Sequence, residues 1–215
     1  MRICFRWVLS LFVFLGFDAV SAEDPQNLAA MQSEPRHALV IGNSTYERIP
    51  LANPVNDAEA MAAALAQCGF VVDKRLNASR TEMAAALETF AAHIQGGGVG
   101  LFYFAGHGFQ INTQNYLLPT DISSLKPAEL EQKTLNVSQV LQRMEAAKNR
   151  INILILDACR NNPFTASAQQ QSSASGLAPM YAATATGSFI AYATAPGRTA
   201  SDGLGKNGLY TSHLL

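Results

Sequence analysis

Charged residues are scarce in this chain of 215 residues. Only 14% of its residues are charged, and 15 lysines and arginines are balanced by 16 acidic residues, for a formal net charge of −1. A chain without a basic excess is poorly suited to neutralising phosphates, which argues against nucleic-acid binding. Apolar residues make up 48%, which argues against disorder. This length and composition suit one well-packed domain.

Cysteine is also rare. Three cysteines are too few for a disulfide scaffold, and no cysteines or histidines are paired at the spacing of a zinc finger. The glycines at 96–98 precede a strand and lack a following Gly-Lys-Ser/Thr, so they are not a phosphate loop. The Gly-x-Ser-x-Gly turn of serine hydrolases is absent too. We therefore expect no metal and no cofactor.

One long apolar run stands at residues 7–17, and no later segment is apolar enough to span a membrane. Arg2 and Arg6 precede the run and small residues follow it up to Ala22, which is typical of a secretory signal peptide. The run is shorter than the ~20 residues of a membrane span; an uncleaved anchor is the alternative. We expect a cut after Ala22 that removes residues 1–22. The mature protein is then expected to be exported, periplasmic or secreted, and to make no contact with the membrane.

Residues 23–35 are small and polar and predict a linker, and residues 36–215 predict the folded domain. Strand and helix patterns alternate along this domain. Strands are expected at residues 37–41, 70–72, 99–105, 151–156 and 189–194. Helices are expected at residues 53–68, 79–94 and 137–144 and from residue 208 onward. This alternation predicts an α/β fold with a mostly parallel central sheet that is covered by helices on both faces.

Local signals mark several boundaries. Asn53-Pro54 supplies a cap and a first-turn proline for the first helix, and Ser79 with Glu82 forms a capping box for the second. Residues 109–118 alternate loosely and predict a small hairpin. The chain stops within the last expected helix, which indicates either a fragment or a shortened domain.

Two reactive side chains follow buried strands. His107 lies between two glycines after the third strand, and Cys159 follows the fourth. Ligands gather at the carboxyl ends of parallel strands, and a single helical crossover would place these two strands side by side. A cysteine nucleophile needs a base and donors for the oxyanion. His107 can act as the base, and the N–H groups of Gly108 and Cys159 can hold the oxyanion.

Each of these residues has a simpler interpretation. His107 could be a loop histidine with satisfied hydrogen bonds, and Cys159 could be a small buried apolar residue. Polar neighbours argue against burial of Cys159, although Arg160 favours its thiolate and Asp157 opposes it. Cys68 ends a helix, where the negative end of the dipole disfavours a thiolate, and we expect it to pack as an apolar residue.

Taken together, the motifs resemble those of the caspase-like cysteine peptidases, on the metacaspase and orthocaspase side of that family. The His motif is Tyr103-Phe104-Ala105-Gly106-His107-Gly108, and the Cys motif is Leu156-Asp157-Ala158-Cys159-Arg160. Further matching segments are residues 38–43, 56–58 and 192–197. The resemblance covers about residues 36–215 and implies a caspase-like three-layer α/β/α sandwich. It also implies that Cys159 is the nucleophile of a cysteine-type endopeptidase, a hydrolase, and that His107 transfers the proton.

The resemblance further implies a specificity. Metacaspases cut after Arg or Lys, and the positions of their acidic residues match Asp57, Asp121 and Asp157, whose convergence would attract a cation. The simpler interpretations are a charge at a helix N-terminus for Asp57 and a turn residue for Asp121. The calcium-binding carboxylates of some metacaspases are not all matched, so we expect no calcium requirement.

The resulting hypothesis is an exported cysteine endopeptidase that cuts proteins or peptides after Arg or Lys through Cys159 and His107. One alternative is a catalytically silent caspase-like module that binds partners. Another is a different α/β hydrolase or transferase that uses the same two residues. Silent relatives usually lose the Cys or the His, and this chain keeps both. The sequence indicates neither the natural substrate nor the oligomeric state.

Overall fold

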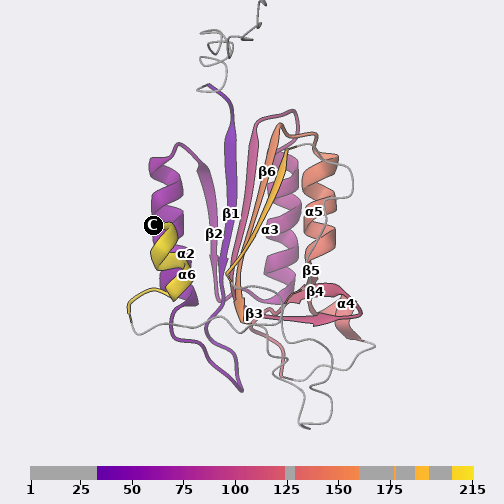
Figure 1. The fold of residues 1–215 in the computed structure, drawn as a ribbon. Coiled ribbons are helices and arrows are strands. Elements are labelled where there is room, and N and C mark those ends of the chain that lie inside the picture. The colour runs from indigo at the N-terminus through magenta and orange to yellow at the C-terminus, as the bar shows by residue number, and fades with distance from the viewer. Residues whose placement is uncertain (1–32, 124–128, 160–176, 178–186, 194–204) are drawn as a thin grey trace, which may run out of the picture. The chain divides into compact units, whose positions relative to one another are not determined.

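A parallel sheet forms the centre of the fold (Figure 1). The order of its strands is β2 (Val71–Leu76), β1 (Arg36–Gly42), β3 (Val99–Ile111), β6 (Ile151–Cys159) and β7 (Ser188–Tyr192). Each neighbouring pair in this order is parallel. The continuously apolar segments at residues 99–105 and 151–156 therefore lie side by side, as the crossover argument predicts.

This computed structural model describes residues 33–123, 129–159, 177, 187–193 and 205–215. The predicted signal peptide at residues 1–22, most of the predicted linker and Arg160 lie outside the described residues. From Glu34 onward the chain forms one unit. Among the helices that are described, none has the length and apolar character needed to cross a membrane.

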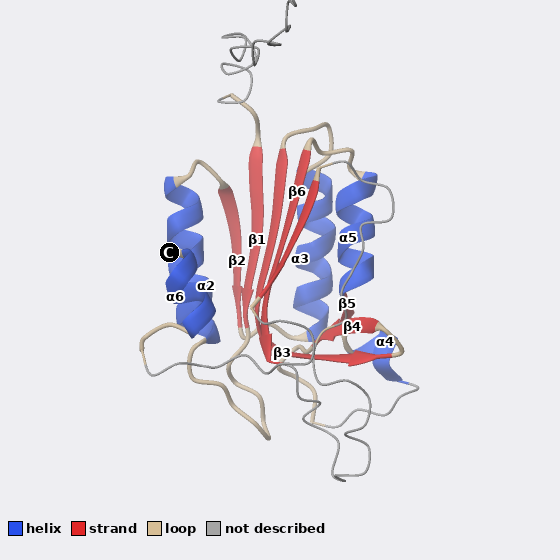
Figure 2. Cartoon of the chain, in the orientation of Figure 1, coloured by secondary structure: helices blue, strands red, loops and turns tan. Residues whose placement is uncertain are grey.

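Helices cover both faces of the sheet (Figure 2). On one face lie α2 (Pro54–Gln67) and α6 (Leu209–Leu214), and on the other lie α3 (Arg80–His93) and α5 (Val137–Ala146). An apolar cluster fills each interface, one including Phe102 and Phe104 and the other including Val40 and Tyr103. The predicted three-layer α/β/α sandwich is confirmed.

Strand β3 is longer than predicted, and this places His107 inside the strand rather than after it. Pairing with β1 ends at Ala105, but the chain continues and pairs antiparallel with β4 (Gln114–Leu117). The predicted hairpin at 109–118 is thus confirmed. The short elements α4 (Leu130–Lys133) and β5 (Leu135–Asn136) were not predicted, and β5 pairs with β4.

Two other local predictions need correction. Strand β2 extends to Leu76 through polar residues because it pairs with β1 alone among the described strands and turns side chains toward water. Asn53 precedes α2 but makes no side-chain capping hydrogen bond, because its backbone is already helical (φ −102°, ψ −21°). The Val55 N–H is instead donated to the Ser44 hydroxyl, at 3.2 Å. The capping box of Ser79 and Glu82 is confirmed.

The first turn of α2 lies directly against the end of β1. A methyl group at Gly42 would overlap the Pro54 carbonyl oxygen and would come within 2.5 Å of the Ala58 Cβ. Glycine is therefore required at this position for the helix to approach so closely. The approach carries Asp57, in the same turn of α2, to the carboxyl end of the parallel sheet.

Candidate active site

The register between β3 and β6 pairs His107 with Cys159. Theirs is the last pair of a ladder that begins with Val99 and Ile151. Because neighbouring strands lie about 4.8 Å apart, the backbones of the two residues lie side by side. The predicted placement of the two strands side by side, with His107 next to Cys159, is therefore present in the fold.

The imidazole of His107 is held in a defined tautomer. Its Nε2 lies 2.7 Å from the Ile49 carbonyl oxygen. A carbonyl oxygen only accepts hydrogen bonds, so Nε2 carries the hydrogen and Nδ1 is the basic nitrogen of the neutral ring. His107 is 4% exposed, which limits competition from water at this position.

The backbone of His107 is fixed by Tyr46. The Tyr46 hydroxyl accepts a hydrogen bond from the His107 N–H at 2.9 Å and donates one to the Leu118 carbonyl oxygen at 3.1 Å. Its ring also packs on the imidazole, with centroids 4.5 Å apart. A methyl group at Gly106 would lie 2.6 Å from the Tyr46 hydroxyl oxygen, so glycine leaves the space that the tyrosine occupies.

Gly108 lies against the end of β6. A methyl group in its place would come 3.1 Å from the Ala158 Cβ and 3.3 Å from the Tyr116 carbonyl oxygen. Its lack of a side chain keeps β3 close to β6, next to the pair of His107 and Cys159. The role of the Gly108 and Cys159 N–H groups as oxyanion donors stays a prediction.

Two of the three predicted acidic residues lie together, beside the first turn of α6. Asp57 Oδ1 accepts hydrogen bonds from the Asn207 side-chain amide at 3.0 Å and from the Gly208 N–H at 2.8 Å. Asp157 Oδ2 accepts one from the Thr211 hydroxyl at 2.8 Å. Asp57 is only 3% exposed, whereas Asp157 is partly exposed. Asp157 is thus the more accessible carboxylate.

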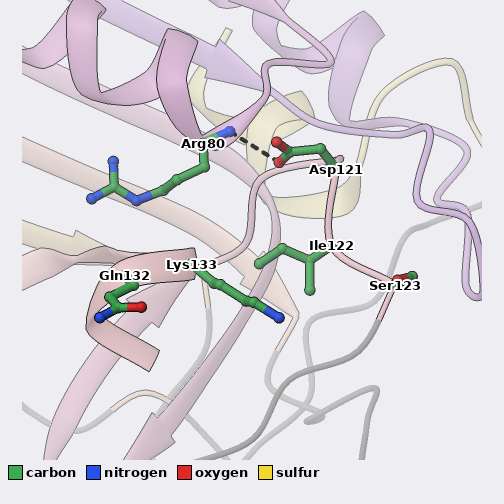
Figure 3. A pocket seen from close by; sticks show the side chains of 6 residues that line it. All are labelled: Arg80, Asp121, Ile122, Ser123, Gln132 and Lys133. Carbon is green, nitrogen blue, oxygen red and sulfur yellow. Dashed lines mark hydrogen bonds between the residues drawn. The ribbon is translucent and has the colours of Figure 1, made fainter. Parts of the chain in front are cut away.

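Asp121 does not join this pair, and the predicted convergence of three carboxylates is wrong. Its Oδ1 accepts a hydrogen bond from the Arg80 N–H at 3.0 Å, at the N-terminus of α3, on the face of the sheet away from α2 (Figures 1 and 3). The positive end of a helix dipole stabilises a carboxylate there. The chain reaches this position because the Thr120 N–H is donated to the Ala78 carbonyl.

Asp121 lines a surface cavity of about 260 Å³ (Figure 3). The other lining residues are Arg80, Ile122, Ser123, Gln132 and Lys133. Neither His107 nor Asp157 contributes to it. This cavity is therefore separate from the candidate active site.

Burial raises the pKa of Tyr103 well above its usual range, and the nearby negative charge of Asp157 raises it further. The pKa of Tyr210 is raised by the same two causes. Both phenols therefore remain protonated near neutral pH. Tyr103 can then act as a hydrogen-bond donor beside the Asp157 carboxylate.

Cys68 is exposed at the end of α2, so the prediction that it packs is wrong. Its carbonyl oxygen accepts a hydrogen bond from Arg36 at 2.9 Å, and Gly69 follows with a φ of 82°. The predicted helix end is confirmed, but Cys68 itself faces water. Cys68 is a thiol that any labelling experiment must take into account.

Several residues of the site carry no signal in the sequence. Tyr46 and Ile49 lie in a polar segment about sixty residues before His107, which gave no indication of contact with it. Thr211 belongs to the expected last helix and Asn207 directly precedes it, but nothing in the sequence connected them to Asp57 or Asp157. In the part of the chain that the structure describes, no group of three or more His, Cys, Asp or Glu residues is arranged to hold a metal ion.

Comparisons with known proteins agree with this architecture. The family model of the caspase domain, a C14 peptidase family, matches residues 35–215. Human mucosa-associated lymphoid tissue lymphoma translocation protein 1 is 32% identical over 124 residues, which span 57% of this chain and 15% of the human protein. Its mouse homolog is also 32% identical over 124 residues, 57% of this chain and 14% of the mouse protein.

A crystal structure of a protein from Geobacter sulfurreducens is similar with a TM-score of 0.42 and 21% sequence identity, covering 58% of this chain and 51% of that one. At that TM-score the similarity adds nothing to the assignment. The assignment rests on the family model, which spans nearly all of the described fold. The chain belongs to the caspase-domain family of peptidases.

Proposed function

We propose that this chain is a cysteine endopeptidase in which Cys159 is the nucleophile and His107 the proton acceptor. The observation that carries the proposal is the strand register that makes these two residues the last pair of the parallel ladder between β3 and β6. Membership of a peptidase family supports the reaction class. The hydrogen bond between Nε2 and the Ile49 carbonyl supports the proton transfer, because it leaves Nδ1 basic.

The reaction follows from these assignments. The thiol proton of Cys159 passes to Nδ1 of His107, and the sulfur bonds to the carbonyl carbon of the peptide. The N–H groups of Gly108 and Cys159 hold the resulting oxyanion. The carbon–nitrogen bond then breaks as the imidazolium returns its proton to the leaving amine. Water, deprotonated by His107, hydrolyses the thioester and restores the thiol.

We also propose that the substrate is cut after Arg or Lys. Asp157 lies two residues before Cys159 and is partly exposed, so its carboxylate can meet a cationic side chain. Asp57 supports the negative potential from beneath α6, where it is nearly buried. Asp121 is not part of this proposal, because its carboxylate lies at the N-terminus of α3.

Export is a further part of the proposal. It rests on the basic start, the apolar run at residues 7–17 and the small residues before position 23. Sequencing the N-terminus of the protein recovered from its native host tests it, and the expected first residue is Glu23. Recovery of Met1 or Arg2 in the cellular fraction would contradict export.

The nucleophile is tested by comparing Cys159→Ala with Cys68→Ala on a library of short peptides. Cys159→Ala should abolish cleavage and Cys68→Ala should leave it intact, because Cys68 lies at the far end of α2. His107→Ala should reduce the rate by about 10²-fold or more, as is typical for loss of general-base assistance. Thiol labelling should be done in the Cys68→Ala background, because Cys68 is exposed. Equal cleavage by folded Cys159→Ala would contradict the proposal.

The library also tests the specificity. Peptides with Arg or Lys before the cut should be preferred over peptides with Asp, and Asp157→Asn should weaken that preference. A folded wild-type protein that cleaves no member of the library would favour the alternative, a silent module that binds partners. A preference for Asp or a small apolar residue would contradict the acidic pocket.

A further inference from the structure

The first turn of α6 is tied to both carboxylates that the specificity proposal uses. The Asn207 amide and the Gly208 N–H bind Asp57 Oδ1, and the Thr211 hydroxyl binds Asp157 Oδ2. These donors come from a segment 54 to 151 residues away in the sequence from the carboxylates that they contact. The C-terminal helix thus forms one wall of the acidic site.

A chain of two hydrogen bonds links the Tyr103 hydroxyl, the Thr211 hydroxyl and the Asp157 carboxylate. Thr211 has one hydroxyl hydrogen, and it is donated to Asp157, since an ionised carboxylate only accepts. The 2.6 Å contact between the Tyr103 and Thr211 hydroxyls must then run from tyrosine to threonine. Both residues are fully buried, at 0% exposure. Water cannot replace either donor without a rearrangement of the core.

Gly208 shows how closely α6 approaches the carboxylates. A methyl group on Gly208 would lie 2.9 Å from Asp57 Oδ2 and 3.7 Å from Asp157 Oδ2. The position of this methyl group is therefore within 4 Å of an oxygen from each carboxylate. The two acids share one site, and α6 is seated on it by backbone and side-chain hydrogen bonds alike.

We propose that Thr211 is a positioning residue that fixes the Asp157 carboxylate for recognition of a basic side chain, with Tyr103 orienting the Thr211 hydroxyl. The inference rests on the proposed specificity for Arg or Lys. Its physical basis is that a guanidinium binds a carboxylate best in one planar, two-pronged geometry. The Thr211 hydroxyl at Oδ2 restricts the orientation of this carboxylate, and loss of that hydroxyl widens the range of orientations open to it. Part of the specificity of the site is thus encoded in α6, outside the Cys and His motifs.

The test compares an arginine peptide with the same peptide carrying citrulline, which has nearly the same shape but no charge. The wild-type ratio of kcat/KM for the two peptides measures recognition of charge. Thr211→Val keeps the shape of threonine and removes its hydroxyl, and it should lower the ratio about tenfold, as expected for loss of a hydrogen bond to a charged group. The loss should appear mainly as a higher KM for the arginine peptide. Thr211→Ser keeps the hydroxyl and should restore the ratio to within about twofold.

A second arm separates positioning from simple stability. Thr89 is an exposed threonine of α3 whose hydroxyl donates to the Ala85 carbonyl at 3.0 Å. Thr89→Val is the matched control and should leave the ratio unchanged. Tyr103→Phe removes only the Tyr103 hydroxyl, which donates to Thr211, and should lower the arginine-to-citrulline ratio of kcat/KM about threefold. In an Asp157→Asn background, Thr211→Val should have no further effect on the ratio, because the two residues act through one contact.

The outcomes are distinguishable. A wild-type enzyme that cleaves both peptides equally overturns the proposed specificity and this inference together. A wild-type enzyme that prefers arginine, with an unchanged ratio in Thr211→Val, overturns this inference alone. Equal losses on both peptides, unrescued by Thr211→Ser, would also overturn it, because they indicate a structural role. If Thr211→Val does not fold, the ratio in Tyr103→Phe decides, and an unchanged ratio counts against the inference.

Discussion

Single atoms decide what His107 can do. The Ile49 carbonyl sets which ring nitrogen carries the hydrogen, and the Tyr46 hydroxyl fixes the backbone on which the ring is mounted. Neither contact is made by a residue with reactive chemistry of its own. The catalytic potential of the histidine therefore depends on a loop whose sequence is unremarkable in composition.

Removal of the Tyr46 hydroxyl should impair catalysis more than stability. Tyr46→Phe keeps the ring on the imidazole but leaves the His107 N–H without that acceptor, and kcat/KM should fall about tenfold, the upper range for one hydrogen bond. KM should change little, because Tyr46 contacts His107 rather than the acidic pair. Tyr116→Phe is the control, since Tyr116 is buried in the same apolar cluster. Equal losses in the two variants would show that the effect is not specific to Tyr46.

At the scale of elements, the site is assembled where strands and helices end. α3 begins with a reciprocal capping box, in which Ser79 Oγ accepts from the Glu82 N–H at 3.3 Å and Glu82 Oε2 accepts from the Ser79 N–H at 2.8 Å. The hydrogen bond from the Ser79 N–H, followed by that from its hydroxyl, lowers the pKa of Glu82. The ionised form of Glu82 is therefore preferred in the folded state.

This preference predicts how the stability of the helix start depends on pH. The pKa of Glu82 is lower in the folded state than in the unfolded state. The contribution of the ionised carboxylate to the stability of the protein is therefore complete above the unfolded pKa of about 4.3. It is lost as the pH falls through the folded pKa. Glu82→Ala should therefore lower the melting temperature at pH 7 and should differ less from the wild type near pH 3. Thermal unfolding followed by circular dichroism measures both differences. A decrease in melting temperature of the same size at the two pH values would contradict the role of the ionised carboxylate.

Across the whole molecule, the strand order of the sheet brings together segments that are far apart in the sequence. They meet at the carboxyl ends of the parallel strands. β3 and β6 are neighbours although the hairpin, α4, β5 and α5 separate them in the sequence. α6, which follows β7 in the sequence, lies at the same place and contacts β3 and β6 through Thr211. The candidate site therefore exists only once the sheet has assembled.

The sequence between β6 and β7 predicts whether the proposed enzyme cuts itself during maturation. The segment from Asn161 to Gly197 contains no Lys, Arg, Asp or Glu, so an enzyme specific for Arg or Lys has no bond to cut there. We expect the active protein to remain uncut between Asn161 and Gly197. Intact mass of the active enzyme checks this, with Cys159→Ala as the reference. Two fragments separated within residues 161–197 in the wild type alone would contradict both the single chain and the specificity.

The sequence by itself determined most of the elements and pointed to His107 and Cys159 as the candidate pair. Periodicity, caps and terminating glycines act within a few residues, so β1, α2, α3, β6 and the capping box at Ser79 were predictable. The Cys and His motifs identified the two neighbouring strands on which His107 and Cys159 lie. Predictions failed where pairing decided the outcome: β2 extends through polar residues because β1 accepts them as a partner, and β3 continues past Gly106 because β4 is there to pair with it.

Only the tertiary structure decided which side chains surround the pair. Asp121 has the same chemistry as Asp157, yet a hydrogen bond to the Arg80 N–H places it at the start of α3. Tyr46 and Thr211 reach His107 and Asp157 because the sheet brings together positions 54 to 61 residues apart. Hydrogen bonds need donor and acceptor within about 3 Å, and sequence patterns carry no information about which distant groups will meet at that distance.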